Sequence, residues 1–174
     1  MMSYIKRVNC IQLDGLKCVL AFVAGAMALL IVQYVSMTEA TQPSVLSAVE
    51  EVVLKPASLG LLARVDTGAA TSSISAQQIE IYKKQGQDWV SFKLSHSTLD
   101  ETLALHAPLV RYAQVRQASQ PEPVMRPVVI LSVELQGEVL ELEFSLTDRT
   151  HLNYPLLLGR NLIGKGWLVD INRR

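Results

Sequence analysis

Cysteine is almost absent from this chain. Cys10 and Cys18 are the only two in 174 residues, so the sequence after residue 18 has neither a disulfide nor thiol chemistry. Histidine is also scarce, and His96, His106 and His151 form no metal-ligand pattern such as His-Glu-x-x-His. Each is interpreted as a surface or hydrogen-bonding side chain. Because no glycine-rich phosphate loop occurs either, we expect no metal and no cofactor.

An excess of charge of either sign is missing as well. Lys plus Arg and Asp plus Glu both number 16, which gives a formal net charge of zero. Without a basic excess the sequence does not point to a nucleic-acid partner. Aromatic residues make up only 6% of the chain although hydrophobic residues reach 49%, and much of that apolar content lies near the N-terminus.

The apolar segment at 19–35, VLAFVAGAMALLIVQYV, carries no charge and predicts a transmembrane anchor. Its length is at the lower limit for a helix that crosses a hydrocarbon core of roughly 30 Å. Lys6, Arg7 and Lys17 precede it, and the first cation after it is Lys55. The positive-inside rule therefore predicts a cytoplasmic segment at 1–18 with the rest of the chain on the other side of the membrane.

Two other interpretations of the same segment stay open. A cleaved signal peptide has only TEA at 38–40 as a weak cleavage site, and its apolar region usually has about 7–15 residues. A buried core helix is the third, although the segment is apolar on every face.

The remaining sequence predicts a linker at 36–52 and a mostly β domain at 53–174. A short apolar strand is expected at 59–65, directly before Asp66. Alternating residues around turn sequences predict two hairpins, with strands at 79–84 and 89–94 and at 128–135 and 138–146. Residues 95–127, which contain four prolines, predict a long loop with one strand around 107–115. The C-terminal sequence predicts an apolar strand, a glycine, a short helix and a last strand.

Asp66-Thr67-Gly68 follows the apolar run LGLLARV and suggests acid–base chemistry. Two carboxylates that share one proton can act as base toward a water and as acid toward a carbonyl. An Asp-Thr-Gly turn can hold such a carboxylate, because the strand fixes its position and glycine allows close approach. Taken alone, the tripeptide is a weak signal, because a lone Asp in a turn is more often a cap or a turn residue at the end of a strand.

Small residues after the turn and a second motif strengthen this interpretation. Ala69 and Thr71 belong to a run of small and hydroxyl side chains that could support the carboxylate. About 90 residues later, PLLLGRNLIGKG at 155–166 resembles the second signature of retropepsins. In that fold an apolar-apolar-Gly segment packs under the Asp loop in a psi-shaped arrangement. The resemblance implies that the loop is braced by Leu157, Leu158, Gly159, Arg160 and Asn161.

The stretch from about 60 to 171 also resembles a bacterial family of retropepsin-like aspartic endopeptidases known as ATP-dependent zinc proteases. The matching pieces are RVDTGAATSSISA, WVSFKL, LVRYAQVRQAS, RPVV, FSLTDRTHLNYPLLLGRNLI and LVD. The resemblance implies a retropepsin-like closed barrel, equivalent to a single acid-protease lobe, preceded here by the predicted transmembrane helix. Zinc and ATP are not expected, for the reasons given above.

The resemblance also implies a peptide or protein substrate, with Asp66 as the catalytic carboxylate. Since the chain has one Asp-Thr-Gly, a dyad would need Asp66 from both chains of a homodimer. Retropepsins usually pair the arginine of the second signature with an acid after Asp-Thr-Gly-Ala. Those positions are Ala70 and Thr71 here, so we expect Arg160 to pair with Asp148 or Asp170. No glycine-rich flap is evident.

Together with the predicted anchor, the bacterial resemblance implies a single-pass protein of the inner membrane with its C-terminal domain in the periplasm. The alternative function is a non-catalytic peptide- or partner-binding regulatory module with the same fold. Relatives are associated with ATP-grasp ligases that add glutamate to proteins, so such a ligase is a partner by analogy only. The simplest alternative is an anchored β domain in which Asp66 is a turn residue.

Overall fold

The computed structural model describes residues 44–55, 57–116 and 122–173. The predicted cytoplasmic segment at 1–18 and the predicted anchor at 19–35 lie outside these ranges. Among the described residues, no helix combines the length and apolar character needed to cross a membrane. The account that follows concerns the domain formed by these three ranges.

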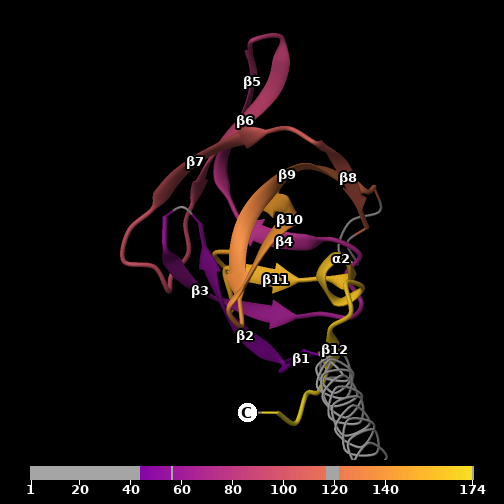
Figure 1. The fold of residues 1–174 in the computed structure, drawn as a ribbon. Coiled ribbons are helices and arrows are strands. Elements are labelled where there is room, and N and C mark those ends of the chain that lie inside the picture. The colour runs from indigo at the N-terminus through magenta and orange to yellow at the C-terminus, as the bar shows by residue number, and fades with distance from the viewer. Residues whose placement is uncertain (1–43, 56, 117–121, 174) are drawn as a thin grey trace, which may run out of the picture. The chain divides into compact units, whose positions relative to one another are not determined.

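Seven of the described strands form one sheet, in the order β10-β4-β11-β3-β2-β9-β8. An additional pairing of β9 with β10 closes the first six strands into a barrel (Figure 1). The seventh strand, β8, pairs with β9 and is the edge strand of the sheet. The strands are β2 (Val49–Leu54), β3 (Leu59–Val65), β4 (Ser72–Ser75), β8 (Arg111–Val115), β9 (Val124–Leu135), β10 (Glu138–Thr147) and β11 (Leu156–Leu158). The predicted mostly β closed barrel is therefore confirmed.

Apolar side chains from several strands fill the barrel, and β3 shows the clearest alternation. In β3, Leu61, Ala63 and Val65 are buried while the residues between them are exposed, as expected for a strand with one face on the core. Phe144 of β10, the largest fully buried side chain, packs in the same cluster. β4 differs because all four of its residues, SSIS, are buried. Its serines therefore need hydrogen-bond partners inside the domain.

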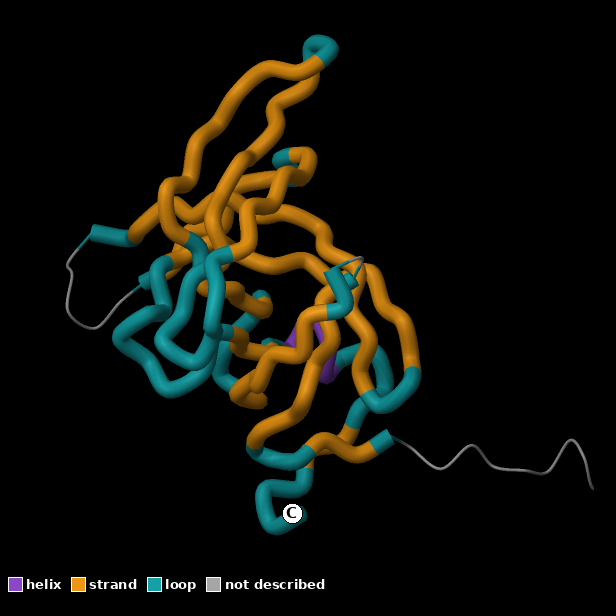
Figure 2. The backbone as a smooth tube through the Cα atoms, turned by 90° about the vertical axis from the view of Figure 1, so that its left-hand side faces the viewer, coloured by secondary structure: helices purple, strands orange, loops and turns teal. Residues whose placement is uncertain are grey.

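A second sheet of three strands contains β5 (Gln77–Lys84), β6 (Gln87–Leu94) and β7 (Leu103–Pro108). The hairpin of β5 and β6 projects away from the barrel (Figure 2). Both predicted hairpins are confirmed, and their turns explain why. Gln85-Gly86 and Gln136-Gly137 all have positive φ, which is typical of the type I′ turn that matches strand twist.

The predicted linker at 36–52 is wrong from residue 45 onward. β1 (Val45–Leu46) pairs in parallel with β12 (Leu168–Val169), and β2 begins at residue 49. Leu46 is completely buried in the core, which holds this segment in the domain despite its small, polar neighbours. The C-terminal prediction is confirmed, since β11 is followed by a glycine, the helix α2 (Arg160–Ile163) and β12.

The strand predicted around 107–115 is confirmed by β8, but the rest of the predicted long loop at 95–127 is wrong, because it also contains β7 and the first residues of β9. Two of its prolines, Pro108 and Pro127, lie where a missing N–H is tolerated. Pro108 ends β7, and Pro127 lies beyond Val128, the last residue of β9 that pairs with β10. At Pro127 the only paired neighbour of β9 is β8.

Candidate active site around Asp66

Asp66 lies directly after β3 and is held by backbone on both sides. Its own N–H donates to the carbonyl of Leu158 at 2.9 Å, and the N–H of Gly68 donates to its Oδ1 at 2.8 Å. The residue is half-buried. One carboxylate oxygen is therefore fixed by the turn, and the position of the group follows the end of the apolar strand.

The segment β11 lies between β3 and β4, which is the psi arrangement expected from the second motif. Leu157 is in register with Arg64 of β3 in parallel and with Ser73 of β4 in antiparallel orientation. Leu158 is buried and supplies the carbonyl that binds the Asp66 N–H. The structure thus brings the two predicted motifs together, although about 90 residues separate them in the chain.

Gly159 lies where the chain passes closest to the loop that follows Asp66. A Cβ atom at this position would lie 2.9 Å from both the carbonyl oxygen of Ala69 and the carbonyl carbon of Thr71. Real Cβ atoms essentially never approach backbone so closely, so the crossing requires glycine. The next residue continues the contact, since the N–H of Arg160 donates to the Ala69 carbonyl at 2.8 Å.

Asn161 connects three parts of the site through its side chain. Its Oδ1 accepts from the N–H of Ser72 at 2.9 Å and from the Ser72 hydroxyl at 2.8 Å. Its Nδ2 donates to the carbonyl of Glu143 in β10 at 2.9 Å. The Ser72 oxygen also accepts from the N–H of Gly159 at 3.0 Å. This network satisfies the buried start of β4 and locks α2 onto the barrel.

The prediction that Arg160 pairs with Asp148 or Asp170 is wrong. The guanidinium is exposed, and its Nη1 donates to the carbonyls of Thr67 and Gly68 at 3.0 and 2.7 Å. Within the described ranges it forms no ion pair. The reasoning assumed a buried arginine that needs an anion, whereas solvent stabilises this charge and backbone oxygens supply the acceptors. Arg160 therefore braces the Asp66 loop directly.

Thr71 ends the loop and contacts a neighbouring ion pair. Its hydroxyl accepts from Nη2 of Arg111 at 3.3 Å, and Arg111 pairs with Glu143 at 2.6 Å. The backbone of this loop is therefore tied to β8 and β10 as well as to α2. Thr67 is exposed, and its carbonyl, as described above, binds Arg160.

Arg149 is a site residue to which the sequence analysis assigned no role. It is only 7% exposed, and it donates from Nη1 to the Ser73 hydroxyl at 3.0 Å and from Nε to the Tyr154 carbonyl at 3.3 Å. Burial lowers the pKa of Arg149, the charge of Arg126 lowers it further, and the charge of Asp66 raises it. Two arginines and the Asp66 carboxylate therefore share one electrostatic environment. The available signal was the TDR sequence at 147–149, in which Arg149 comes two positions after the end of β10.

A cavity of about 370 Å³ connects these groups. Residues 68–71 of the Asp66 loop form one part of its wall and residues 113–115 of β8 another. Arg126, which is half-buried, and Arg149 both line it. The cavity thus places two guanidinium groups beside the loop that carries the candidate catalytic carboxylate.

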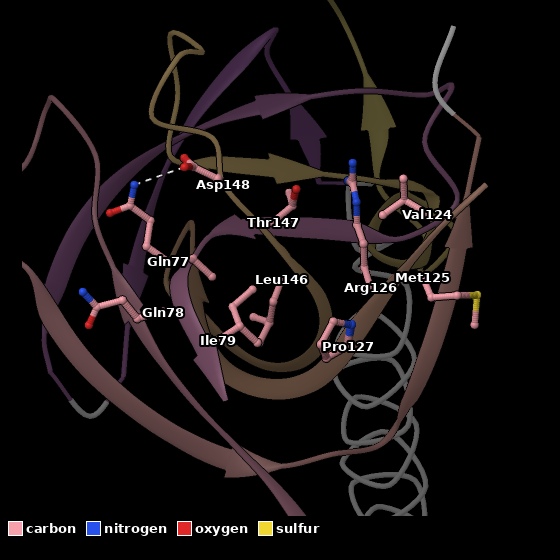
Figure 3. Close-up of a pocket in the computed structure, with 11 residues that line it drawn as sticks. Gln77, Gln78, Ile79, Val124, Met125, Arg126, Pro127, Leu146, Thr147 and Asp148 are labelled. Carbon is pink, nitrogen blue, oxygen red and sulfur yellow. Dashed lines mark hydrogen bonds between the residues drawn. The ribbon is translucent and has the colours of Figure 1, made fainter. Parts of the chain in front are cut away.

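A larger cavity of about 770 Å³ shares Arg126 as a lining residue (Figure 3). Figure 3 shows Leu146, Ile79 and Pro127 at one end of it and the tips of Arg126 and Asp148 at the other. The backbone N–H and hydroxyl of Thr150, followed by the amide of Gln77, lower the pKa of Asp148 to about 2. Asp148 is exposed, so this cavity has an ionised carboxylate at its polar end.

The lowered pKa of Asp148 predicts a small loss of stability in acid. A carboxylate whose pKa is depressed on folding stabilises the domain above its unfolded pKa of about 4, and this contribution is lost as the pH falls through about 2. Because the side chain is exposed, we expect Asp148→Asn to cost less than about 1 kcal/mol at pH 7 and only a small part of that at pH 2. Urea unfolding at both pH values measures this difference. Asp100→Asn, in the exposed loop between β6 and β7, is the control, and an equal cost at the two pH values would contradict the assignment.

The histidines show no arrangement for a metal. His96 is buried, with Nε2 2.9 Å from the Leu152 carbonyl and Nδ1 2.8 Å from the Thr98 hydroxyl. It is hydrogen-bonded as predicted, but inside the domain instead of on a loop surface. His106 is on β7 and meets the ring of Tyr82 edge-on. In the part of the chain that the structure describes, no group of three His, Cys, Asp or Glu side chains could hold a metal ion.

Comparison with known families gives a match over most of the chain. The model of the RimB-like family, described as retropepsin-like aspartic endopeptidase RimB, matches residues 45–174. This range contains the whole barrel, the Asp66 loop and the bracing segment after β11.

Curated relatives are similar over a shorter stretch. Proteins named probable alpha-L-glutamate ligase from Shewanella pealeana and Shewanella halifaxensis are each 36% identical over 110 residues, and one from Desulfotalea psychrophila is 29% identical. Each match covers 62% of this chain and 24% of the relative. The matched region thus spans about a quarter of the length of these relatives.

A solved structure has the same fold. The crystal structure of protein Lpg0085 from Legionella pneumophila, of unknown function, is 28% identical, with a TM-score of 0.65. The match covers 76% of this chain and 96% of the Legionella chain.

Proposed function

Because the chain belongs to the RimB-like family of retropepsin-like aspartic endopeptidases, we propose that it hydrolyses peptide bonds with Asp66 as the catalytic carboxylate. The observation that carries this proposal is the bracing of the Asp66 loop. Leu158, Gly159 and Arg160 contact it through backbone hydrogen bonds and close packing. These contacts fix the position of the carboxylate more tightly than a turn with no chemical role would need, as expected for a reacting group.

The proposed reaction needs a second carboxylate. Each chain contributes one Asp-Thr-Gly loop, so we infer an isologous homodimer in which Asp66 of two chains share a proton. The ionised carboxylate takes a proton from water, whose oxygen attacks the peptide carbonyl carbon. The protonated carboxyl group donates its proton to the carbonyl oxygen, which gives a tetrahedral intermediate with two hydroxyl groups. When this intermediate collapses and the C–N bond breaks, the carboxyl group that took the proton of water gives it to the leaving amine, and the other carboxylate takes back a hydroxyl proton.

The predicted anchor would assist this dimer. A helix at 19–35 would confine two copies to one plane and raise their effective concentration. In this proposal 1–18 is cytoplasmic, the protein is in the bacterial inner membrane, and the barrel faces the periplasm. The domain then begins at β1, so the tether between the anchor and Val45 is shorter than the linker that the sequence predicts.

Concentration dependence tests the two-chain dyad. We expect full-length protein in detergent to cleave a peptide library between pH 4 and 8, with activity per chain rising as the dimer fraction rises. Light scattering at each protein concentration measures that fraction. Cleavage by a species that stays monomeric at all concentrations would contradict the shared dyad.

A second candidate function is a non-catalytic module that binds a peptide or a partner enzyme. The observation in its favour is that similar sequences occur within much longer proteins named probable alpha-L-glutamate ligase. A domain beside such an enzyme could regulate it, and a separate ATP-grasp ligase is then the partner to test. A folded protein that binds peptides without turnover would favour this function over hydrolysis.

A further inference from the structure

Two arginines beside the Asp66 loop have no acidic partner inside the described domain. The guanidinium of Arg149 donates only to neutral oxygens, of Ser73 and Tyr154, and neither it nor Arg126 forms an ion pair there. A buried guanidinium without an anion is costly, and a second one nearby increases the cost. Such an arrangement is typical of a site that an external anion completes.

The nearby carboxylates are engaged elsewhere. Glu143 pairs with Arg111 at 2.6 Å, and Asp148 accepts from Thr150 and Gln77. The charge of Asp66 acts on Arg149, yet no oxygen of Asp66 lies within 4.0 Å of a guanidinium nitrogen. The cavity of about 370 Å³ is lined by both arginines and by residues 68–71 of the Asp66 loop, whereas Asp66 itself is not among its lining residues.

The walls of this cavity suit an extended peptide. One wall is the Asp66 loop and another is β8, whose pairing within the described sheet is with β9 alone. The other side of β8 therefore leaves backbone groups for a further strand. A peptide lying along it would pass residues 68–71 of the Asp66 loop, and a short side chain or a chain end would reach the cavity that Arg149 lines.

We propose that Arg149 and Arg126 form a carboxylate-binding subsite of the cleft, which selects peptides with a carboxylate close to the bond facing Asp66. This inference rests on the proposed function. Guanidinium groups bind carboxylates through paired N–H donors, and Arg149 has Nη2 left beyond its two hydrogen bonds. The carboxylate can come from an acidic side chain or from the C-terminus of the peptide.

Matched peptides distinguish these sources by isothermal titration calorimetry on full-length Asp66→Asn protein, which should bind without turnover. The first set contains amidated alanine–leucine octapeptides with one Glu, or Gln in its place, moved along the chain. The second set is neutral, with a free or an amidated C-terminus. We expect roughly ten- to a hundredfold tighter binding of the carboxylate member in one set, the range for a charged hydrogen bond.

Two arginine variants and one control test the assignment. Arg126→Gln, which changes a half-buried side chain, is expected to remove most of the preference for the carboxylate peptide. Arg149→Lys keeps the charge but loses the paired N–H donors, so this variant should retain part of that preference. Arg64→Gln, exposed on β3 and outside the cavity lining, should retain all of it. Equal affinities within the pairs, no binding of any peptide, or a preference that survives Arg126→Gln would overturn the subsite.

Wild-type cleavage of the same peptides separates this inference from the proposed function. Cleavage that depends on Asp66 but is equally fast for peptides with and without the carboxylate would contradict the subsite and support the proposed hydrolysis. Preferential binding of the carboxylate peptide that depends on Arg126, without cleavage of any peptide, would support the subsite and contradict the proposed hydrolysis.

Discussion

Asp66→Asn is expected to reduce peptide hydrolysis by at least about a thousandfold, because an amide cannot accept the proton of the attacking water. Asparagine keeps an Oδ1 atom for the Gly68 N–H, so the loop retains its 2.8 Å hydrogen bond. Circular dichroism and the thermal midpoint should therefore match those of the wild type. Initial rates on a cleaved peptide, measured over at least four decades, provide the test.

Asp100→Asn is the matched control, since it makes the same chemical change in the exposed loop between β6 and β7. It should leave the rate unchanged. Retained hydrolysis in folded Asp66→Asn protein would show that another group performs the chemistry.

Co-assembly of the two proteins extends this test to the dyad. If wild-type and Asp66→Asn chains mix at random in equal amounts, about a quarter of the dimers have two intact carboxylates. The activity of the mixture should then fall to about a quarter of that of the same total amount of wild-type protein. A fall to one half would indicate that each chain acts alone.

Gly159→Ala is expected to destabilise the domain by about 3 kcal/mol or more, a large part of the 5–15 kcal/mol that ordinarily stabilises a domain. The new Cβ would lie 2.9 Å from the Ala69 oxygen and the Thr71 carbon, and both are backbone atoms that cannot rotate away. Relief requires the Asp66 loop to separate from α2. The midpoint of urea unfolding measures the loss.

Gly60→Ala is the control for this substitution. The added Cβ on β3 would meet only the carboxylate end of Glu51, at 3.2 Å, and a flexible side chain can move. We expect a change of less than about 1 kcal/mol there. If Gly159→Ala were as stable as Gly60→Ala, this would contradict the close approach of Gly159 to the backbone of the Asp66 loop.

The features that the sequence could predict depend on local chemistry or on paired motifs. The two hairpins follow from Gln-Gly turns between alternating strands, and no distant residue is needed to form them. The Asp66 loop and its brace were predictable only from the two motifs together, because the Asp-Thr-Gly tripeptide alone is a weak signal. The position of β11 beside β3 and β4 agrees with what the resemblance to retropepsins implies.

The features that the sequence could not predict depend on distant partners. Residues 45–46 form a strand because β12, more than 120 positions later, pairs with them. Arg160 binds carbonyls, which no sequence pattern marks, and so a carboxylate was wrongly expected. Arg149 is buried among serines of β4 and the backbone of Tyr154, and only the folded barrel brings these groups together.

The way in which Arg160 holds the Asp66 loop bears on how this site responds to acidity. Its acceptors are two backbone carbonyl oxygens, those of Thr67 and Gly68, which a proton does not neutralise in the acid range. An arginine paired with a carboxylate would lose its partner's charge as that acid became protonated. This contact to the loop therefore does not depend on the ionisation of a second acidic residue, and the acid limb of a rate profile would report the carboxylates that react.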